Sequence, residues 1–425
     1  MFATRISRLL PPGVHYAWVV LGVMFFSALC AMGVRSAPGV IIVPLQKEFG
    51  WSVSTISGAV SLNIILLGVL APFMAGLMQT VGLKRTVMCC LSLLTVGVFL
   101  SMFMTQPWQL YLTWGLMVGV GASAGSIGLA TAIANRWFAT RRGMVVGIMT
   151  SASATGQLIF LPLLGAMAEW YGWQSVALTL GAAMAAVVCL LGLILAESPA
   201  RIGVAPFGGT MTAAPVTAQG GNPFMVTING LKRGVKSLDF WLLGLSFAVC
   251  GFSTNGLIGT HLISYCGDNG IGQVVAASTL ASLGVFSMIG ANVSGWLTDR
   301  VNPRYILFVV YSLRGLSLLI LPFTDFSTTS LLIFAAFYGL DWIATGAPTY
   351  ALTNQIFGER DAPVIISWIY TMHQIGGATA AIMAGTVRDV TGSYMFAFMA
   401  SGFVCLLASL LVLRIRKPAM ALAAA

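Results

Sequence analysis

Charged residues are scarce in this 425-residue sequence, since Asp, Glu, Lys and Arg together make up only 8% of it. Soluble domains carry about 25% charged residues, so this scarcity excludes an ordinary soluble globular protein. Hydrophobic residues make up 58% of the chain, and the mean hydropathy is +0.93. These values indicate a polytopic membrane protein.

Residue types that carry out catalysis are also rare. The chain has three histidines and 11 acidic residues, and they form no arrangement of a nucleophile with a base. No P-loop is present, which excludes ATP hydrolysis by that motif. The seven cysteines include no CxxC pair and no metal-ligand spacing. The sequence therefore predicts a protein that is not an enzyme and that needs no cofactor and no metal.

Long apolar runs are what the sequence has in abundance. A run of about 20 apolar residues is long enough to cross a bilayer as a helix. Twelve such runs can be identified, and we predict one transmembrane helix for each: 16–45, 53–78, 87–104, 109–134, 144–166, 174–196, 239–265, 272–297, 305–323, 329–354, 363–387 and 393–413.

The basic residues predict the orientation of these helices. With the N-terminus placed in the cytoplasm, 17 of the 21 Lys and Arg residues fall in inside segments and two, Lys47 and Arg388, in outside segments. This asymmetry follows the positive-inside rule and predicts that both termini are cytoplasmic. The net charge of +10 is then explained by topology and by contact with membrane lipids, and we expect no nucleic-acid partner.

The two halves of the chain resemble each other at a constant offset of 220 residues. Glu48 then aligns with Asp268, and Glu169 aligns with Asp389. Many glycines align in the same way without a gap. Such an offset predicts two parallel repeats around a site near the middle of the membrane. We therefore predict an all-α fold with two pseudo-symmetric six-helix bundles, residues 1–196 and 239–425, joined by a cytoplasmic linker, residues 197–238.

One charged turn carries a family motif. The segment "GWLTDRVNPR", Gly295 to Arg304, resembles the pattern Gly-x-Leu-x-Asp-Arg-x-Gly-Arg-Arg of the major facilitator superfamily, and the first-half copy has Gln79 and Thr80 in place of Asp-Arg. The resemblance implies the major facilitator fold and a gating role for Asp299, Arg300 and Arg304, in which Asp299 caps a neighbouring helix. A purely structural turn is the alternative.

Three further segments resemble bacterial carriers of the monocarboxylate and oxalate–formate type: "NRWFATRRGMVVGI", "THLISYCGDNGI" and "YGLDWIATGAPT". The resemblance implies a secondary transporter of small organic anions, mono- or dicarboxylates, that works by rocker-switch alternating access. Symport with protons is the coupling that we expect. We predict a monomer in the inner membrane of a bacterium.

Arg35 is the only charge between Tyr16 and Leu45. A charge at the centre of a membrane helix costs roughly 2.5–3.5 kcal/mol on insertion scales. Its partner in the repeat is Asn255, so the two residues are predicted to face each other across the site. We expect Arg35 to bind the carboxylate of the solute through two hydrogen bonds. The alternative is that Arg35 reaches the membrane surface or caps a helix broken near Pro38.

Arg314 and Asp341 are the other two charges inside the membrane, and they lie on consecutive predicted helices. They are expected to form a structural ion pair. Alternatively, Asp341 carries the coupled proton and also contacts the solute, with Arg314 released or shared during the cycle.

Four further polar residues are candidates for the binding site. His261 and His373 can each contact the solute, and His373 can also take part in coupling as a proton relay. The alternative for both is a neutral histidine bonded to a backbone carbonyl. Asn63 and Tyr350 can complete the polar lining, although single polar residues in membrane helices often only join helices together.

Two other functions remain open from the sequence. The first is an exporter of amphipathic compounds, such as drugs or siderophores, through the same fold. The second is a transporter-like sensor that binds a solute without moving it. An exporter should have a larger, more aromatic cavity without a committed cation, and a sensor normally needs an added signalling domain.

Overall fold

The computed structural model describes residues 2–9, 11, 14–125, 127–210 and 222–416. Nearly all of these residues are helical. The N-terminal half contains a short first helix followed by the predicted spans: α1 (Phe2–Leu9), α2 (Tyr16–Phe49), α3 (Val53–Thr80), α4 (Leu83–Ser101), α5 (Pro107–Leu110), η1 (Tyr111–Val118), α6 (Gly119–Ser123), α7 (Ile127–Trp137), α8 (Arg142–Tyr171) and α9 (Trp173–Ile194).

The C-terminal half begins after the linker, which the sequence predicts as a loop. The structure shows two helical segments within it, η2 (Pro199–Ile202) and α10 (Pro223–Gly234), while residues 211–221 lie outside the described part. The following helices are α11 (Leu238–Gly251), η3 (Phe252–Ile258), α12 (Gly259–Asp268), α13 (Gln273–Thr298), α14 (Pro303–Ile320), η4 (Leu321–Phe323), α15 (Thr328–Trp342), α16 (Gly346–Thr391) and α17 (Met395–Val412).

Ten helices in the described residues are long and apolar enough to cross a membrane. The predicted spans 109–134 and 363–387 are not separate members of this set. The first is divided among α5, η1, α6 and α7, and residue 126 is not described. The second is the later part of α16, which continues through Gly358 at φ +75° and ψ 160°. The count of twelve therefore stays a prediction.

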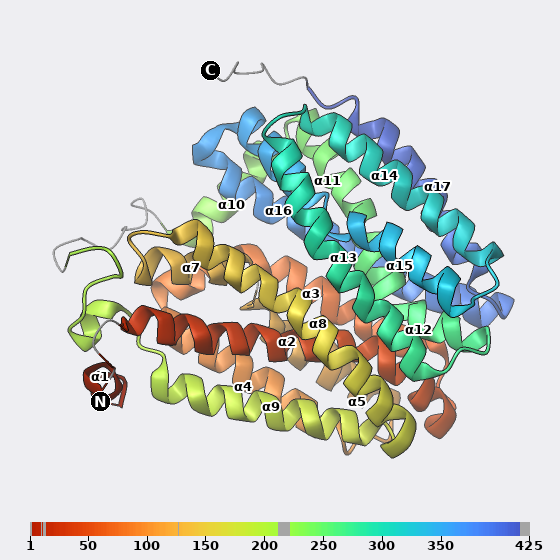
Figure 1. Cartoon of the computed structure of the whole chain (residues 1–425), viewed down its shortest axis with the longest axis horizontal. Helices are drawn as coiled ribbons and strands as arrows, with labels where there is room; N and C mark the ends of the chain where they lie inside the picture. The colour runs from red at the N-terminus through yellow and green to blue at the C-terminus, as the bar shows by residue number, and fades with distance from the viewer. Residues whose placement is uncertain (1, 10, 12–13, 126, 211–221, 417–425) are drawn as a thin grey trace.

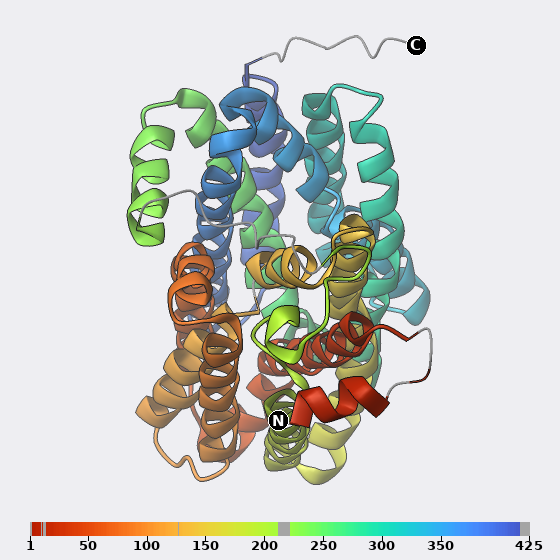
Figure 2. The same cartoon turned by 90° about the vertical axis from the view of Figure 1, so that its left-hand side faces the viewer.

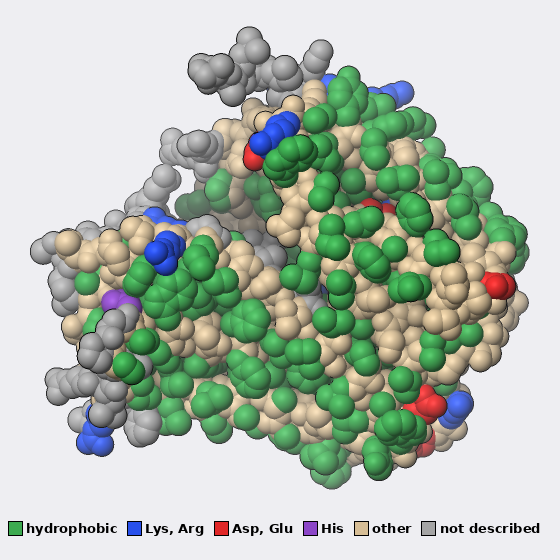
Figure 3. Space-filling model, viewed as in Figure 1, with side chains coloured by type: hydrophobic (Ala, Val, Ile, Leu, Met, Phe, Trp, Pro, Cys, Tyr) green, Lys and Arg blue, Asp and Glu red, His purple; other side chains and the backbone are tan. Residues whose placement is uncertain are grey.

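The surface of the molecule agrees with a membrane-spanning protein. Hydrophobic side chains cover most of the face in Figure 3, and the charged side chains gather toward its ends. In Figure 1, α1 and α10, which are predicted to be cytoplasmic, lie on the left, whereas α5 and α12 lie on the right. Viewed from the left-hand end, the N-terminal half lies below the C-terminal half (Figure 2).

Pairs of contacts between the halves recur at the offset of 220 residues. The backbone N–H of Ser54 donates to Asp389 over 2.7 Å, and that of Val274 donates to Glu169 over 3.3 Å. Both members of the second pair lie 220 residues before or after their counterparts in the first. In each case a carboxylate at the end of one helix, α16 or α8, binds the N-terminus of a helix in the other half. Two repeats would produce this pattern.

Close helix packing repeats in the same way. A side chain added at Gly385 in α16 would meet Ser57 in α3, and one added at Gly165 in α8 would meet Ala277 in α13. These glycines again differ by 220, as do Ser57 and Ala277. Glycine is needed because small residues allow membrane helices to approach closely. The right-hand ends of the two halves in Figure 1, predicted to face outward, are thus tied together on both sides.

The carboxylate of Asp389 provides a test of these outer ties. Asp389→Ala removes two hydrogen bonds to the N-terminus of α3, at 3.0 and 2.7 Å, and leaves both backbone donors unpaired. A lost cap of this kind costs about 1 kcal/mol, which is roughly fivefold in the ratio of two states. We expect a cysteine at Ser57 to react faster with an impermeant maleimide added from outside. Asp268→Ala is the matched control, because Asp268 pairs with Arg388 inside its own half. Equal rates in both variants would contradict the outer ties.

Candidate functional site

A cavity of about 220 Å³ lies beside the middle of α2 and is lined by Arg35. Helices α2, α4, α6, α7 and α8 supply nearly all of its wall. Apart from Arg35, the polar side chains that line it are Ser27, Ser153 and Tyr370. The rest of the wall is apolar and small, formed by Ala28, Ala31, Met32, Val87, Leu91, Ala122, Ala124, Gly125, Leu129, Ala130 and Met149.

Arg35 is exposed to this cavity and has no counter-ion. None of the hydrogen bonds or ion pairs in the described part of the chain involves its guanidinium. The preceding turns of α2 are packed tightly, since Phe160 of α8 lies against Gly33. Arg35 is therefore a cation on a well-packed helix, next to free space, with five unused donors.

Asn255 lies in η3, a segment wound as a π-helix, and is held by α16. Its side-chain nitrogen donates to Gln374 Oε1 over 3.0 Å and lies 3.3 Å from His373 Nε2. Asn255 does not line the cavity of Arg35. A stack joins the two places, because the His373 ring lies parallel to Tyr370, at 11° and 5.8 Å between centroids. π-Helical turns are frequent at functional sites.

The two buried histidines are both bonded to carbonyl groups. His373 Nδ1 lies 3.1 Å from the Phe247 carbonyl oxygen. His261 is completely buried, with Nε2 at 2.8 Å from the Ala381 carbonyl oxygen and Nδ1 at 3.3 Å from the Tyr394 hydroxyl. This is the alternative considered for both residues, a neutral histidine in a fixed position. A relay through either one would have to break these bonds.

Asn63 and Tyr350 lie outside the cavity of Arg35. Asn63 donates to the Trp114 carbonyl oxygen over 2.7 Å, and both residues line a separate small pocket between α3 and η1. This bond fastens α3 to the π-helical turn η1. Tyr350 is half-buried in α16, and its hydroxyl has no hydrogen-bond partner among the described residues. The structure therefore does not bring either residue together with Arg35.

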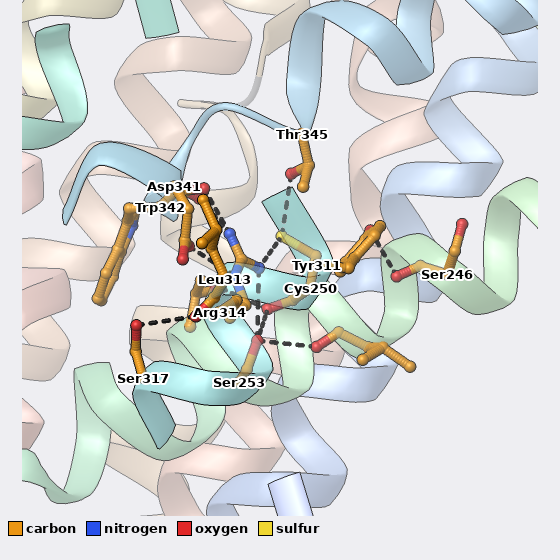
Figure 4. A network of polar contacts seen from close by, with 12 residues as sticks. Ser246, Cys250, Ser253, Tyr311, Leu313, Arg314, Ser317, Asp341, Trp342 and Thr345 are labelled. Carbon is orange, nitrogen blue, oxygen red and sulfur yellow. Dashed lines mark hydrogen bonds and ion pairs between the residues drawn. The ribbon is translucent and has the colours of Figure 1, made fainter. Parts of the chain in front are cut away.

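Arg314 and Asp341 form a fully buried ion pair with 2.7 Å between Nε and Oδ1 (Figure 4). Arg314 Nη2 donates to the Asp341 carbonyl oxygen over 2.5 Å, and Nη1 lies 2.9 Å from Cys250 Sγ. The guanidinium also lies 5.8 Å from the ring centroid of Tyr338. The predicted pairing is thus present. One atom is left over, because Asp341 Oδ2 is buried without a hydrogen-bond partner among the described residues.

The predicted gating residues lie at the turn between α13 and α14. Asp299 is exposed at the C-terminal end of α13 and makes no hydrogen bond within the described part of the chain. Arg300 stacks on Trp296 at 4.3 Å, and Arg304 donates to the Leu413 carbonyl oxygen. The helix cap expected from Asp299 is therefore not made in this conformation.

Glu197 is a residue that the sequence reasoning missed. It stands just after α9 and caps α4, accepting from the backbone N–H of Leu83 at 2.6 Å and of Lys84 at 3.0 Å. It also accepts a bond from Arg136 at 2.5 Å. It thus binds the first-half turn in which the motif's acid is absent. The scarcity of acids in the chain was the signal that could have identified it.

Removing this cap should lower stability in a pH-dependent way. Burial raises the pKa of Glu197, but the hydrogen bonds from Leu83, Lys84 and Arg136 outweigh it and hold the pKa below the ordinary value of 4.5. The stabilisation is therefore complete above pH 4.5 and is lost as the pH falls through the lower, folded-state pKa. Glu197→Ala should cost about 1–2 kcal/mol at pH 7 in thermal unfolding, and this difference should shrink in acid. Asp299→Ala, which removes an unbonded acid, should change nothing, and an equal loss in both variants would contradict this role.

The comparisons with known proteins agree with this architecture. Residues 24–381 match the model of the Major Facilitator Superfamily. Monocarboxylate transporter 12 of Rattus norvegicus is 24% identical, with 96% of this chain and 87% of that protein covered. An uncharacterized transporter of the same superfamily, YcxA of Bacillus subtilis, is also 24% identical, with 89% and 90% covered.

Solved structures show the same fold. A bacterial homologue of the human lysosomal transporter Spinster, inward-facing and occupied, has a TM-score of 0.73 at 15% identity, covering 94% of this chain and 96% of that one. A POT family transporter in complex with a thioalcohol-conjugated peptide has a TM-score of 0.70 at 13% identity, covering 92% and 95%. The protein is a multi-pass membrane transporter and not an enzyme, and its chain belongs to the Major Facilitator Superfamily.

Proposed function

We propose that this transporter carries small organic monoanions across the inner membrane of a bacterium, in symport with protons and by rocker-switch alternating access. The observation that carries the proposal is Arg35, an unpaired cation that lines a cavity beside the middle of α2. A protein tolerates such a charge where a ligand or cavity water supplies the counter-ion. The guanidinium fits a carboxylate through two parallel hydrogen bonds.

The rest of the cavity wall favours one carboxylate over two. Arg35 is the only charged side chain in the lining, and most of the other lining side chains are small and apolar. A second carboxylate would face this apolar wall without a partner, and a buried unpaired charge is costly. The solute should therefore combine one carboxylate with a compact apolar body. The names of the related monocarboxylate transporters support this assignment.

The size of the cavity argues against the exporter hypothesis. Pockets for drug-sized ligands enclose about 300–1,000 Å³. The cavity of Arg35, at about 220 Å³, is smaller, and Tyr370 is the one aromatic side chain among its lining residues. An exporter of amphipathic compounds should have a larger, more aromatic cavity without a committed cation.

Uptake into proteoliposomes tests the proposed function. Purified protein would be assayed with radiolabelled monocarboxylates and dicarboxylates of two to six carbons, with and without an inward proton gradient. We expect uptake of one or more monocarboxylates, stimulated by the gradient, and discrimination of at least about 100-fold against the dicarboxylate of equal length. Uptake that prefers dicarboxylates, or solutes without negative charge, would contradict the proposal.

A further inference from the structure

Tyr370 is the one residue of the C-terminal half that lines the cavity of Arg35. All the other lining residues lie between Ser27 and Ser153, in the N-terminal half. Tyr370 belongs to α16, which packs along α3 through contacts such as the bond from the Thr371 hydroxyl to the Gly68 carbonyl oxygen, 2.9 Å long. The cavity is therefore closed on one side by a side chain from the opposite half.

The ring of Tyr370 is held in place, but its hydroxyl group is not. The ring lies parallel to that of His373, and His373 is fixed by the Phe247 carbonyl oxygen at 3.1 Å and by the Asn255 side chain at 3.3 Å. The Tyr370 hydroxyl makes no hydrogen bond with any residue that the structure describes. A positioned phenol with an unused donor thus borders the same free space as Arg35.

We propose that Tyr370 donates a hydrogen bond to the same carboxylate that Arg35 binds, so that one anion is held by both halves of the transporter. A carboxylate has about four lone-pair sites. A bidentate contact with Arg35 uses two of them and leaves the others open for the phenol. This inference rests on the proposed function, because it requires a carboxylate at Arg35.

The support of Tyr370 moves as part of the C-terminal half. Gly251 and Gly256 of the segment that carries Asn255 lie directly against the backbone of His373 and Gly377 in α16, with no room for a side chain. Asn255, His373 and Tyr370 therefore form one unit. An anion that reaches both Arg35 and Tyr370 binds more tightly when the halves are close, and differential binding of this kind shifts the population toward the closed state.

A phenylalanine at this position isolates the hydroxyl group. Tyr370→Phe keeps the ring and its stack on His373, so the fold should be unchanged. Binding would be measured in detergent with propanoate, butanoate and hexanoate as probes. A hydrogen bond to a charged group is strong enough that we expect at least about tenfold weaker binding in Tyr370→Phe. Tyr305→Phe, which alters an exposed tyrosine of α14, is the matched control and should bind as the unmodified protein does.

A second measurement distinguishes a link between the halves from a local contact. Spin labels at Val81 and Val301, which are both exposed and occupy equivalent turns, report the distance between the predicted cytoplasmic ends, after the exposed Cys89 and Cys189 are replaced by alanine. Saturating butanoate should shorten this distance in the labelled parent protein. The same saturation should leave the distance unchanged in Tyr370→Phe.

The outcomes separate this inference from the proposed function. If the unmodified protein binds none of the three probes, the proposed function and the inference both fail. If it binds them and Tyr370→Phe binds equally well, only the inference is wrong. If Tyr370→Phe binds more weakly but still shortens the distance at saturation, Tyr370 does not link the halves.

Discussion

Arg35→Gln is expected to fold and insert normally but to lose the binding of monocarboxylates. No hydrogen bond or ion pair with a described residue depends on the Arg35 guanidinium, so its removal leaves no buried partner behind. It also removes a charge that is costly inside the membrane. The bidentate contact with the carboxylate disappears, which should weaken binding by roughly 10- to 100-fold or more.

Equilibrium binding of butanoate, with thermal unfolding as the check on folding, measures this effect. Arg35→Lys retains the charge but lacks the planar fork, so we expect an intermediate affinity. Arg85→Gln is the matched control, because Arg85 is exposed at the start of α4 and is unpaired among the described residues. Unchanged affinity in Arg35→Gln would show that this arginine does not bind the solute.

Asp341→Asn is expected to destabilise the protein severely. The Arg314 guanidinium is fully buried and would keep its charge without a counter-ion. Breaking a buried ion pair by removing one partner costs about 3–5 kcal/mol. Arg314→Gln should be equally damaging, since it strands the carboxylate of Asp341. The double variant Arg314→Gln with Asp341→Asn leaves no charge behind and should recover part of the folded yield, measured by size-exclusion chromatography in detergent.

The same double variant tests whether the pair also carries the proton. Asp341 Oδ2 has no partner among the described residues, so it is the atom of the pair that can accept a proton without losing a bond. If Asp341 couples transport to protons, the folded double variant should exchange labelled solute across the membrane but should not accumulate it in response to a pH gradient. Accumulation at the rate of the unmodified protein would limit the pair to a structural role.

Features with a long period could be predicted from the sequence. Apolar runs of about 20 residues indicate the membrane helices, and the offset of 220 residues anticipates contacts as specific as Ser54 with Asp389 and Val274 with Glu169. The pairing of Arg314 with Asp341 also follows, because these are the last two charges in the membrane and each needs a partner.

Features that depend on local winding could not be predicted. Asn255 and Arg35 are equivalent in sequence, but Asn255 lies in a π-helical turn and Arg35 lies in a continuous α-helix. Their side chains therefore meet different surroundings, which no pattern of residue types indicates. Whether Asn63 binds a solute or the Trp114 carbonyl oxygen likewise depends on a π-helical turn, η1, that leaves this carbonyl within reach.

Site residues without charge were also difficult to identify. Tyr370 is one of 10 tyrosines, and only its place in the cavity and its stack on His373 distinguish it. Glu197 follows the last helix of the first half, where an acid usually reads as part of a solvated loop. Its role as the cap of α4 depends on the approach of two helix ends that are far apart in the sequence.

The most direct test of the central claim is a crystal structure of the protein with a bromine-labelled monocarboxylate, such as 4-bromobutanoate. The anomalous signal of bromine locates the apolar end of the molecule, and the density locates the carboxylate. We expect the bromine among the apolar side chains of the cavity and the carboxylate oxygens about 2.7–2.9 Å from the Arg35 guanidinium. A probe bound elsewhere, with Arg35 still unpaired, would contradict the account.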